Sequence, residues 1–206
     1  MMKMGRFQTR SMDDYSVTDD GHLLGVPIKF NSPEVIHTQT GDFEEVIERG
    51  AITDDLLKDV VLFVNHDKSR IPLARTRTGG LKLEIKDDGV HMDAKLNLER
   101  SDCKDAYLAV KDGTISGMSF GFRVADDEWT ELRSAVPKRK IKKIGYVQEV
   151  SVVTNPAYTS TSVYARSDEA LDSDSKALDE ARAQEERDAD AELELLKIKA
   201  LAISNI

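Results

Sequence analysis

Apolar and polar residues alternate over several short stretches of this chain, which is the period of a half-buried β-strand. The clearest example joins residues 81–85 to residues 90–96 through Asp87-Asp88-Gly89, a sequence that favours a tight turn. We therefore predict a β-hairpin there. The other strands that the pattern predicts span residues 22–30, 60–64, 115–124 and 146–153.

Helical signals are fewer and are concentrated in two places. Ser101 can cap a helix over residues 102–110, and Gly113 can end it; Thr53-Asp54-Asp55 is a second helix start. After a polar linker over residues 167–174, residues 177–202 are rich in Ala, Glu, Leu and Lys, which favours a helix. Its apolar positions at helical spacing are Ala189, Leu193, Leu196, Ala200 and Ile203. Such a helix docks on the body, pairs with another chain or frays.

The order of these elements predicts the fold class. Most strands follow one another through short turns, so an antiparallel sheet or barrel is favoured over a doubly wound sheet. We expect a β-rich α+β protein with a loose N-terminal segment (residues 1–20), one domain (residues 21–166) and an acidic helical tail (residues 167–206).

Charge is unevenly distributed along the 206 residues. The net charge is −9, and the tail with its 12 acidic and 5 basic residues carries −7 of it, which leaves −2 on residues 1–166. A nearly neutral body argues against a dedicated nucleic-acid surface. The basic run at residues 138–143 is read as a solvated hairpin arm. Cys103 is the single cysteine, and without an apolar leader or a membrane-spanning run the chain is expected to be cytoplasmic.

Ser119 stands between two glycines in a predicted strand. Because side chains alternate across a strand, Gly117, Ser119 and Gly121 share one face, and the hydroxyl has no bulky neighbour there. This leaves room for a substrate backbone; alternatively, the glycines mark a bulge or close packing. All four histidines precede Ser119, and a strand rather than a helix follows it, so the nucleophile elbow of α/β-hydrolases is excluded.

His66 and Glu149 are the candidate partners of Ser119. His66 follows the apolar run at residues 60–64, where a side chain is both fixed and reachable. Glu149 lies in an apolar strand and needs a partner there unless its face is exposed. That partner is either His66 or one of the arginines Arg75, Arg77 and Arg123. Ser151 lies on the same face of that strand and can help to satisfy it, while Asp67 is the rival third residue. A serine, a histidine and a carboxylate are the parts of a serine hydrolase. The sequence holds no metal-binding motif and no phosphate loop.

Five stretches of the chain, in order and spacing, resemble the prohead (head maturation) serine proteases of tailed phages. They cover residues 43–51, 64–67, 72–76, 117–122 and 149–158, and the resemblance extends over residues 20–166. The family is similar in fold to the herpesvirus assemblins. The resemblance therefore implies a closed antiparallel β-barrel core with surrounding helices. Assemblins have a histidine as the third catalytic residue, whereas this chain offers Glu149.

The same resemblance implies an endopeptidase with His66, Ser119 and Glu149 as catalytic residues and Gly117 and Gly121 beside the substrate. Its expected substrates and partners are the major capsid protein and the scaffold, and often the protease itself, inside the procapsid assembling in the host cytoplasm. Assemblins are dimers, which by analogy suggests a homo-oligomer. No cofactor, metal, membrane or specific nucleic acid is expected. The tail looks like a packaging segment that self-cleavage removes. A non-enzymatic scaffold or chaperone of the same fold, and an esterase of another class, are the competing interpretations.

Overall fold

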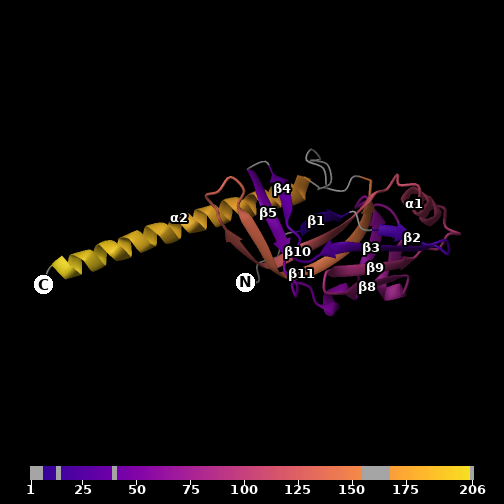
Figure 1. Cartoon of the computed structure of the whole chain (residues 1–206), viewed down its shortest axis with the longest axis horizontal. Helices are drawn as coiled ribbons and strands as arrows, with labels where there is room; N and C mark the ends of the chain where they lie inside the picture. The colour runs from indigo at the N-terminus through magenta and orange to yellow at the C-terminus, as the bar shows by residue number, and fades with distance from the viewer. Residues whose placement is uncertain (1–6, 13–14, 39–40, 155–167, 205–206) are drawn as a thin grey trace.

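The computed structural model describes residues 7–12, 15–38, 41–154 and 168–204, and most of its elements are strands in two sheets (Figure 1). The first sheet has the order β1-β10-β11-β5-β4, with β6 beside β11 and β7 beside β6. Its strands are β1 (Phe7–Met12), β4 (Glu34–Thr38), β5 (Gly41–Ile47), β6 (Val61–Val64), β7 (Ala74–Arg75), β10 (Gly117–Thr130) and β11 (Lys138–Val153).

The second sheet is antiparallel throughout and has the order β2-β3-β9-β8. Its strands are β2 (Tyr15–Val17), β3 (His22–Lys29), β8 (Leu81–Ile85) and β9 (Gly89–Lys95). The hairpin predicted from the alternating pattern is confirmed as β8–β9. Gly89 pairs with Lys29 so closely that a Cβ atom on Gly89 would lie 2.1 Å from the carbonyl oxygen of Ile28. Only glycine fits at that start of the strand.

The closed barrel expected from the family resemblance is wrong for this chain. Both sheets are open, and within the described residues no ladder joins one to the other. The reason lies in β11, which changes partner along its length: residues 138–141 pair with β5, and residues 149–152 pair with β6, in parallel register both times. Register shifts also interrupt the β10–β11 ladder four times. Such irregularities bend strands. The first half of β11 therefore belongs to the part of the sheet that contains β5 and β4, and the second half to the part that contains β6 and β7.

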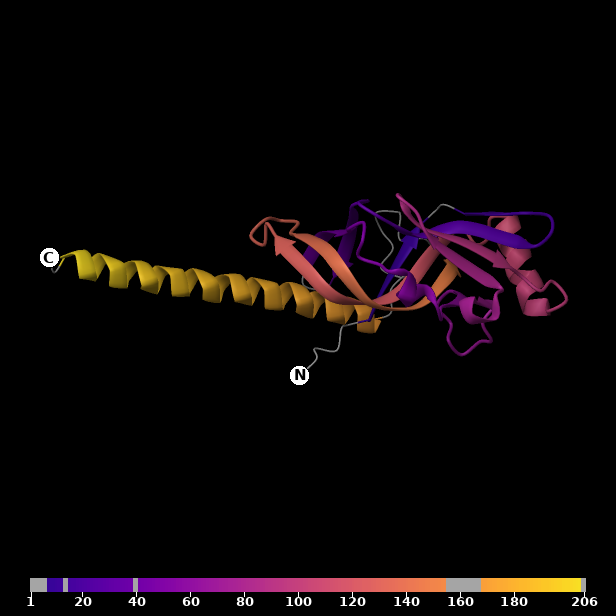
Figure 2. The same cartoon turned by 90° about the horizontal axis from the view of Figure 1, so that it is seen from below.

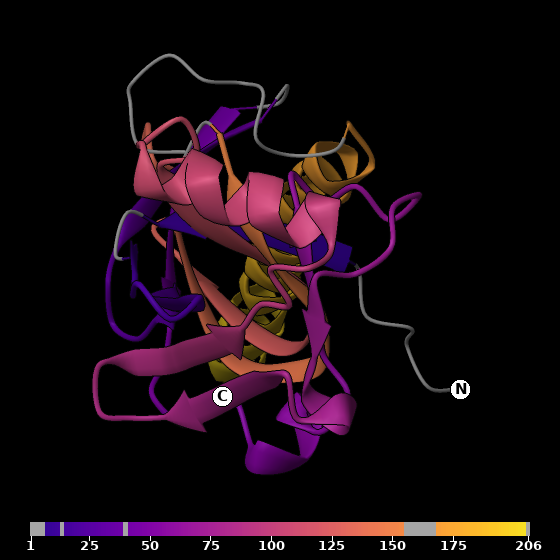
Figure 3. The same ribbon diagram turned by 90° about the vertical axis from the view of Figure 1, so that its right-hand side faces the viewer.

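The surrounding helices expected from the family resemblance are also not found: the described residues contain two α-helices and two short 3₁₀ helices. The 3₁₀ helices are Asp54–Leu57 and Thr76–Thr78. Helix α1 (Ser101–Lys111) ends where Gly113 adopts a φ of 82°, as predicted, and it lies across one end of the sheets (Figure 3). Its first residue is Ser101, and the N-cap position belongs to Arg100 instead. The buried side chains of α1 join the common core.

Helix α2 (Asp168–Ser204) is longer than the predicted tail helix and includes most of the expected linker. Leu178 is fully buried against Ile36 and Phe43, which attaches the first turns of α2 to β4 and β5. Beyond those turns the helix projects away from the body (Figures 1 and 2). None of the described helices combines the length and hydrophobicity needed to cross a membrane.

The basic run forms an arm of the β10–β11 hairpin, as predicted, but one of its cations is not solvated. Arg139 is 4% exposed and bonds to Glu45 (3.2 Å), Asp127 (2.6 Å) and Asp174 of α2 (3.1 Å). Burial alone would lower the pKa of the guanidinium, but the three carboxylates outweigh it and the pKa is raised. The arm is therefore tied to α2 through a buried ion cluster.

Candidate active site

Three neighbouring strands place Ser119 beside Ser151 and Phe63 in one row. Ser119 of β10 is opposite Ser151 of β11, and Ser151 is opposite Phe63 of β6. Side chains of directly paired residues project from the same face of a sheet. Glu149, two residues before Ser151, lies on that face too and is opposite Gly121. Gly117, Ser119 and Gly121 therefore lie on the same face of the sheet as Glu149 of β11.

His66 reaches this face through a tight turn at the end of β6. Asn65 and His66 have φ values of 50° and 58°, and the N–H of Asp67 donates to the carbonyl of Val64 at 3.0 Å. Positive φ at both central residues is the pattern of a type I′ turn. Consecutive left-handed residues other than glycine are costly and occur mainly at functional sites. The turn brings His66 Nδ1 to 2.6 Å from Glu149 Oε1.

Asn65 fixes this turn to the end of β11. Its backbone N–H donates to the carbonyl of Val152 at 2.9 Å. Its side-chain Oδ1 accepts from the N–H of Thr154 at 2.9 Å and from the Thr154 hydroxyl at 3.3 Å. Asparagine tolerates the left-handed region better than most residues. Asn65 can therefore adopt the backbone conformation of the turn and also accept the hydrogen bonds from Thr154. The sequence analysis missed this role, although an asparagine just after a buried strand was the available signal.

Glu149 is fully buried, and both of its carboxylate oxygens have partners. Oε1 faces His66, and Oε2 accepts from the Ser151 hydroxyl at 2.5 Å. An ionised carboxylate only accepts hydrogen bonds, so the short contact assigns the proton of the imidazole to Nδ1. The other ring nitrogen of His66, Nε2, is then free to accept a proton.

Among the residues that the structure describes, Ser119 Oγ and His66 Nε2 are buried polar atoms of the site with no hydrogen-bond partner. Ser119 is 1% exposed, and the His66 side chain is 20% exposed. Unsatisfied buried polar atoms are uncommon in native proteins and call for an explanation. These two are the atoms that a serine–histidine proton relay would use.

The rival partners considered for His66 and Glu149 are engaged elsewhere. Asp67 accepts from the Ser69 hydroxyl and backbone N–H, and these bonds hold the pKa of its carboxyl below the ordinary value. Arg75 bonds to Asp59, while Arg123 lies over the ring of Tyr146. Within the described residues, no group of three histidine, cysteine, aspartate or glutamate side chains has an arrangement that could hold a metal ion.

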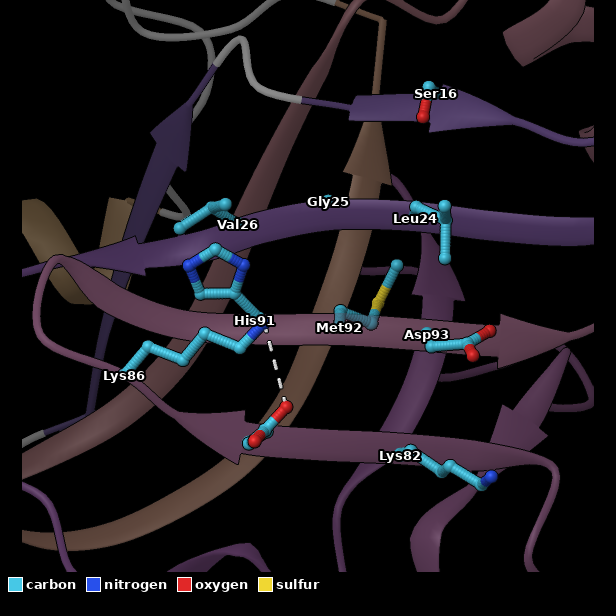
Figure 4. Close-up of a pocket in the computed structure, with 10 residues that line it drawn as sticks. Ser16, Leu24, Gly25, Val26, Lys82, Lys86, His91, Met92 and Asp93 are labelled. Carbon is cyan, nitrogen blue, oxygen red and sulfur yellow. Dashed lines mark ion pairs between the residues drawn. The ribbon is translucent and has the colours of Figure 1, made fainter.

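The other histidines lie away from this site. His22 bonds to Asp93, His37 pairs with Asp42, and His91 bonds to Asp88. His91 lines a separate concave surface on the second sheet. Figure 4 shows Ser16, His91 and Lys82 spaced apart there on three different strands. Ser16 and His91 are separated there by strand β3, which lies between β2 and β9.

Sequence similarity to known proteins indicates the family of this chain. Residues 6–174 match the family model described as caudovirus prohead serine protease. Over 163 residues the chain is 28% identical to the prohead protease of Enterobacteria phage HK97, a match that covers 77% of this chain and 68% of that protein. No solved structure matches the chain. Because the family model covers most of the sequence, from β1 to the first turns of α2, the chain belongs to the caudovirus prohead serine protease family.

Proposed function

We propose that the chain is a serine endopeptidase that cleaves capsid-protein extensions and scaffold, and also itself, while the prohead matures inside the host cell. The observation that carries this proposal is the His66–Glu149 pair on the sheet face that also bears Ser119, whose hydroxyl has no hydrogen-bond partner among the described residues. Family membership supports the reaction class, and the similarity to the prohead protease of phage HK97 supports the setting.

The proposed mechanism gives each residue of the site a role. Ser119 Oγ attacks the peptide carbonyl while His66 Nε2 takes its proton, and Glu149 stabilises the imidazolium through Nδ1–H. The imidazolium then protonates the leaving amine, which leaves an acyl group on Ser119. A water molecule, activated by the same imidazole, releases that acyl group. Gly117 and Gly121 flank the nucleophile on its own face and leave room for the substrate backbone.

The paired strands around Ser119 limit how a substrate can approach. β11 occupies one edge of β10, and β1 occupies the other, with Ser11 opposite Ser119. An extended substrate therefore reaches Ser119 over the face of the sheet, unless it displaces β1. The face bearing Glu149 and the two glycines is the side on which the reaction takes place in this proposal.

Helix α2 supports a role in packaging or in contacting the scaffold. Leu193 and Leu196 are 51% and 55% exposed on the projecting part of the helix, although such side chains are usually covered. We propose that this acidic helix contacts the scaffold or a second copy of the protease, and that self-cleavage removes it. The division of the chain into N-terminal segment, protease domain and tail stays a prediction.

Intact-mass spectrometry of the wild type and of Ser119→Ala over time tests the proposal. Both proteins are followed at dilute and concentrated loadings, first alone and then with the capsid protein and scaffold of the same phage. We expect the wild type to release fragments and the variant to remain whole. His66→Ala serves as the matched control, because it keeps the nucleophile and removes its base.

The same experiment separates the protease from a non-enzymatic assembly factor of the same fold. If wild type and Ser119→Ala leave every substrate intact, or cleave it equally, the proposed activity is wrong. Co-sedimentation of both proteins with scaffold would then identify a binding role, since Ser119→Ala leaves the exposed side chains of α2 unchanged.

A further inference from the structure

A hollow of about 540 Å³ lies between helix α1 and the segment that runs from the end of β6 to β7. Its lining is mainly apolar. Leu73, Ala106 and Ile115 are buried beneath it, and Ile71 stands at its edge with 72% of its surface exposed. A ligand that covers Ile71 would remove this apolar surface from water, which favours binding.

The hollow shares a wall with the candidate active site. Val64, Asn65 and Asp67, the neighbours of His66 in the turn, line it. Phe63 also lines it, and Phe63 belongs to the row that runs through Ser151 to Ser119. Adjacent strands lie about 4.8 Å apart, so Phe63 is about 10 Å from Ser119 across the sheet. An extended peptide covers that distance in about three residues.

We propose that this hollow, bounded by Phe63, Ile71, Ala109 and Ile115, is a substrate subsite. It binds an aliphatic or aromatic side chain of the substrate, two or three residues from the bond that Ser119 attacks. The inference rests on the proposed protease function and adds a substrate preference to it.

The charges around the hollow favour an apolar occupant over an acidic one. Asp102 is paired with Arg100 at 2.6 Å, and this bond lowers the pKa of its carboxyl. Asp67 is held by Ser69. Asp105 is exposed at the edge and no cation partner is described for it. Arg70 also lines the hollow, but it is 79% exposed and already paired with Asp67 at 3.6 Å. An acidic substrate residue would therefore meet three carboxylates and one exposed, paired cation over an apolar floor.

Filling the hollow from α1 tests the subsite. Ala109→Leu adds bulk to a partly buried lining residue, and leucine is a good helix former. Leu108→Ala is the matched control, because Leu108 directly precedes Ala109 in the same helix, is 46% exposed and does not line the hollow. Each variant is assayed on peptides spanning a mapped cleavage site. The peptides carry leucine, alanine or aspartate at successive positions near the scissile bond.

We expect the wild type to prefer leucine over alanine and aspartate at one such position. Ala109→Leu should lower kcat/KM for that leucine peptide by at least about 10-fold and change the alanine peptide by less than about 2-fold. Leu108→Ala should leave both values unchanged. Equal loss on the leucine and alanine peptides, or no loss, would overturn the subsite.

A binding measurement keeps this result separate from the proposed activity. Fluorescence anisotropy of the same peptides is recorded with Ser119→Ala and with Ser119→Ala carrying Ala109→Leu. If the wild type cleaves nothing, the protease proposal fails. The subsite is then overturned as well if the two inactive proteins bind the leucine peptide equally, and it persists as a peptide-binding site if Ala109→Leu weakens that binding.

Discussion

The Ser151 hydroxyl donates a hydrogen bond to Oε2 of Glu149, and the other carboxylate oxygen, Oε1, contacts His66. Ser151 and Glu149 are fully buried, and they alternate with core side chains along β11. The carboxylate is therefore held from both sides, which fixes the plane in which it meets the imidazole. Outer partners of this kind orient the groups that touch the reacting atoms.

We predict that Ser151→Ala lowers kcat about 10-fold or more and leaves KM nearly unchanged, because the carboxylate that orients His66 loses the hydrogen bond to its second oxygen. The measurement is kcat and KM for the wild type, Ser151→Ala and Ser151→Thr. Threonine retains the hydroxyl and should restore kcat. An unchanged kcat in Ser151→Ala would show that Ser151 contributes only to packing.

Glu149→Gln tests the third residue of the site at nearly constant shape. The amide can still contact His66 and Ser151, but it no longer compensates the charge that forms on the imidazole. We expect kcat to fall by about 10²- to 10⁴-fold while the melting temperature changes little. If Glu149→Gln retains activity and Asp67→Asn abolishes it, Asp67 rather than Glu149 is the third residue.

Asn65 should matter through its side-chain acceptor as well as through its backbone conformation. Asn65→Gly keeps the left-handed turn and loses the bonds to Thr154, whereas Asn65→Asp retains an acceptor at the same place. We expect Asn65→Gly to lower kcat about 10-fold or more, and Asn65→Asp to lower it less. Equal activity of the two variants would mean that the bond to Thr154 has no part in placing His66.

Much of the site could be predicted because its residues follow simple periods. Alternation along a strand put Ser119 and its glycines on one face, and a carboxylate within an apolar strand had to have a partner. The structure brings His66 to Glu149, as the sequence analysis expected. The sequence did not reveal the turn at Asn65 and His66, because two left-handed residues have no propensity signal beyond the asparagine itself.

The fold was less predictable because it depends on long-range pairing. The hairpin at residues 81–96 follows from local alternation, whereas the change of partner along β11 depends on segments about 90 residues away. That change keeps the sheets open, so the barrel inferred by analogy was wrong. Arg139 is a second example of long-range dependence. It is buried in part by its pair with Asp174 of α2, and the sequence analysis had placed Asp174 in a polar linker.

Cys103 should be unreactive in the folded protein. It is fully buried, and this burial raises the pKa of its thiol. We expect almost no reaction with a maleimide at pH 8 until denaturant is added. Because the unfolded thiol ionises from about pH 8.5 upward while the folded thiol stays protonated, stability should decline as pH rises past that value. Cys103→Ala should remove this part of the decline, and rapid labelling of the native protein would contradict the prediction.

Arg139→Met should destabilise the protein by about 3–5 kcal/mol, because it leaves buried carboxylates without their shared cation. Asp174 is fully buried and Glu45 is 2% exposed, so water cannot replace the guanidinium easily. Urea unfolding at neutral pH gives the change in free energy of unfolding, and limited proteolysis reports whether α2 has come away from β4 and β5.

Lys140→Ala is the control on the same strand: its pair with Glu48 is half-exposed, and its loss should cost at most about 1 kcal/mol. Equal effects of the two substitutions would mean that the ion cluster is not what attaches α2 to the body. Early release of α2 from Arg139→Met alone would show that this cluster holds the projecting helix in place.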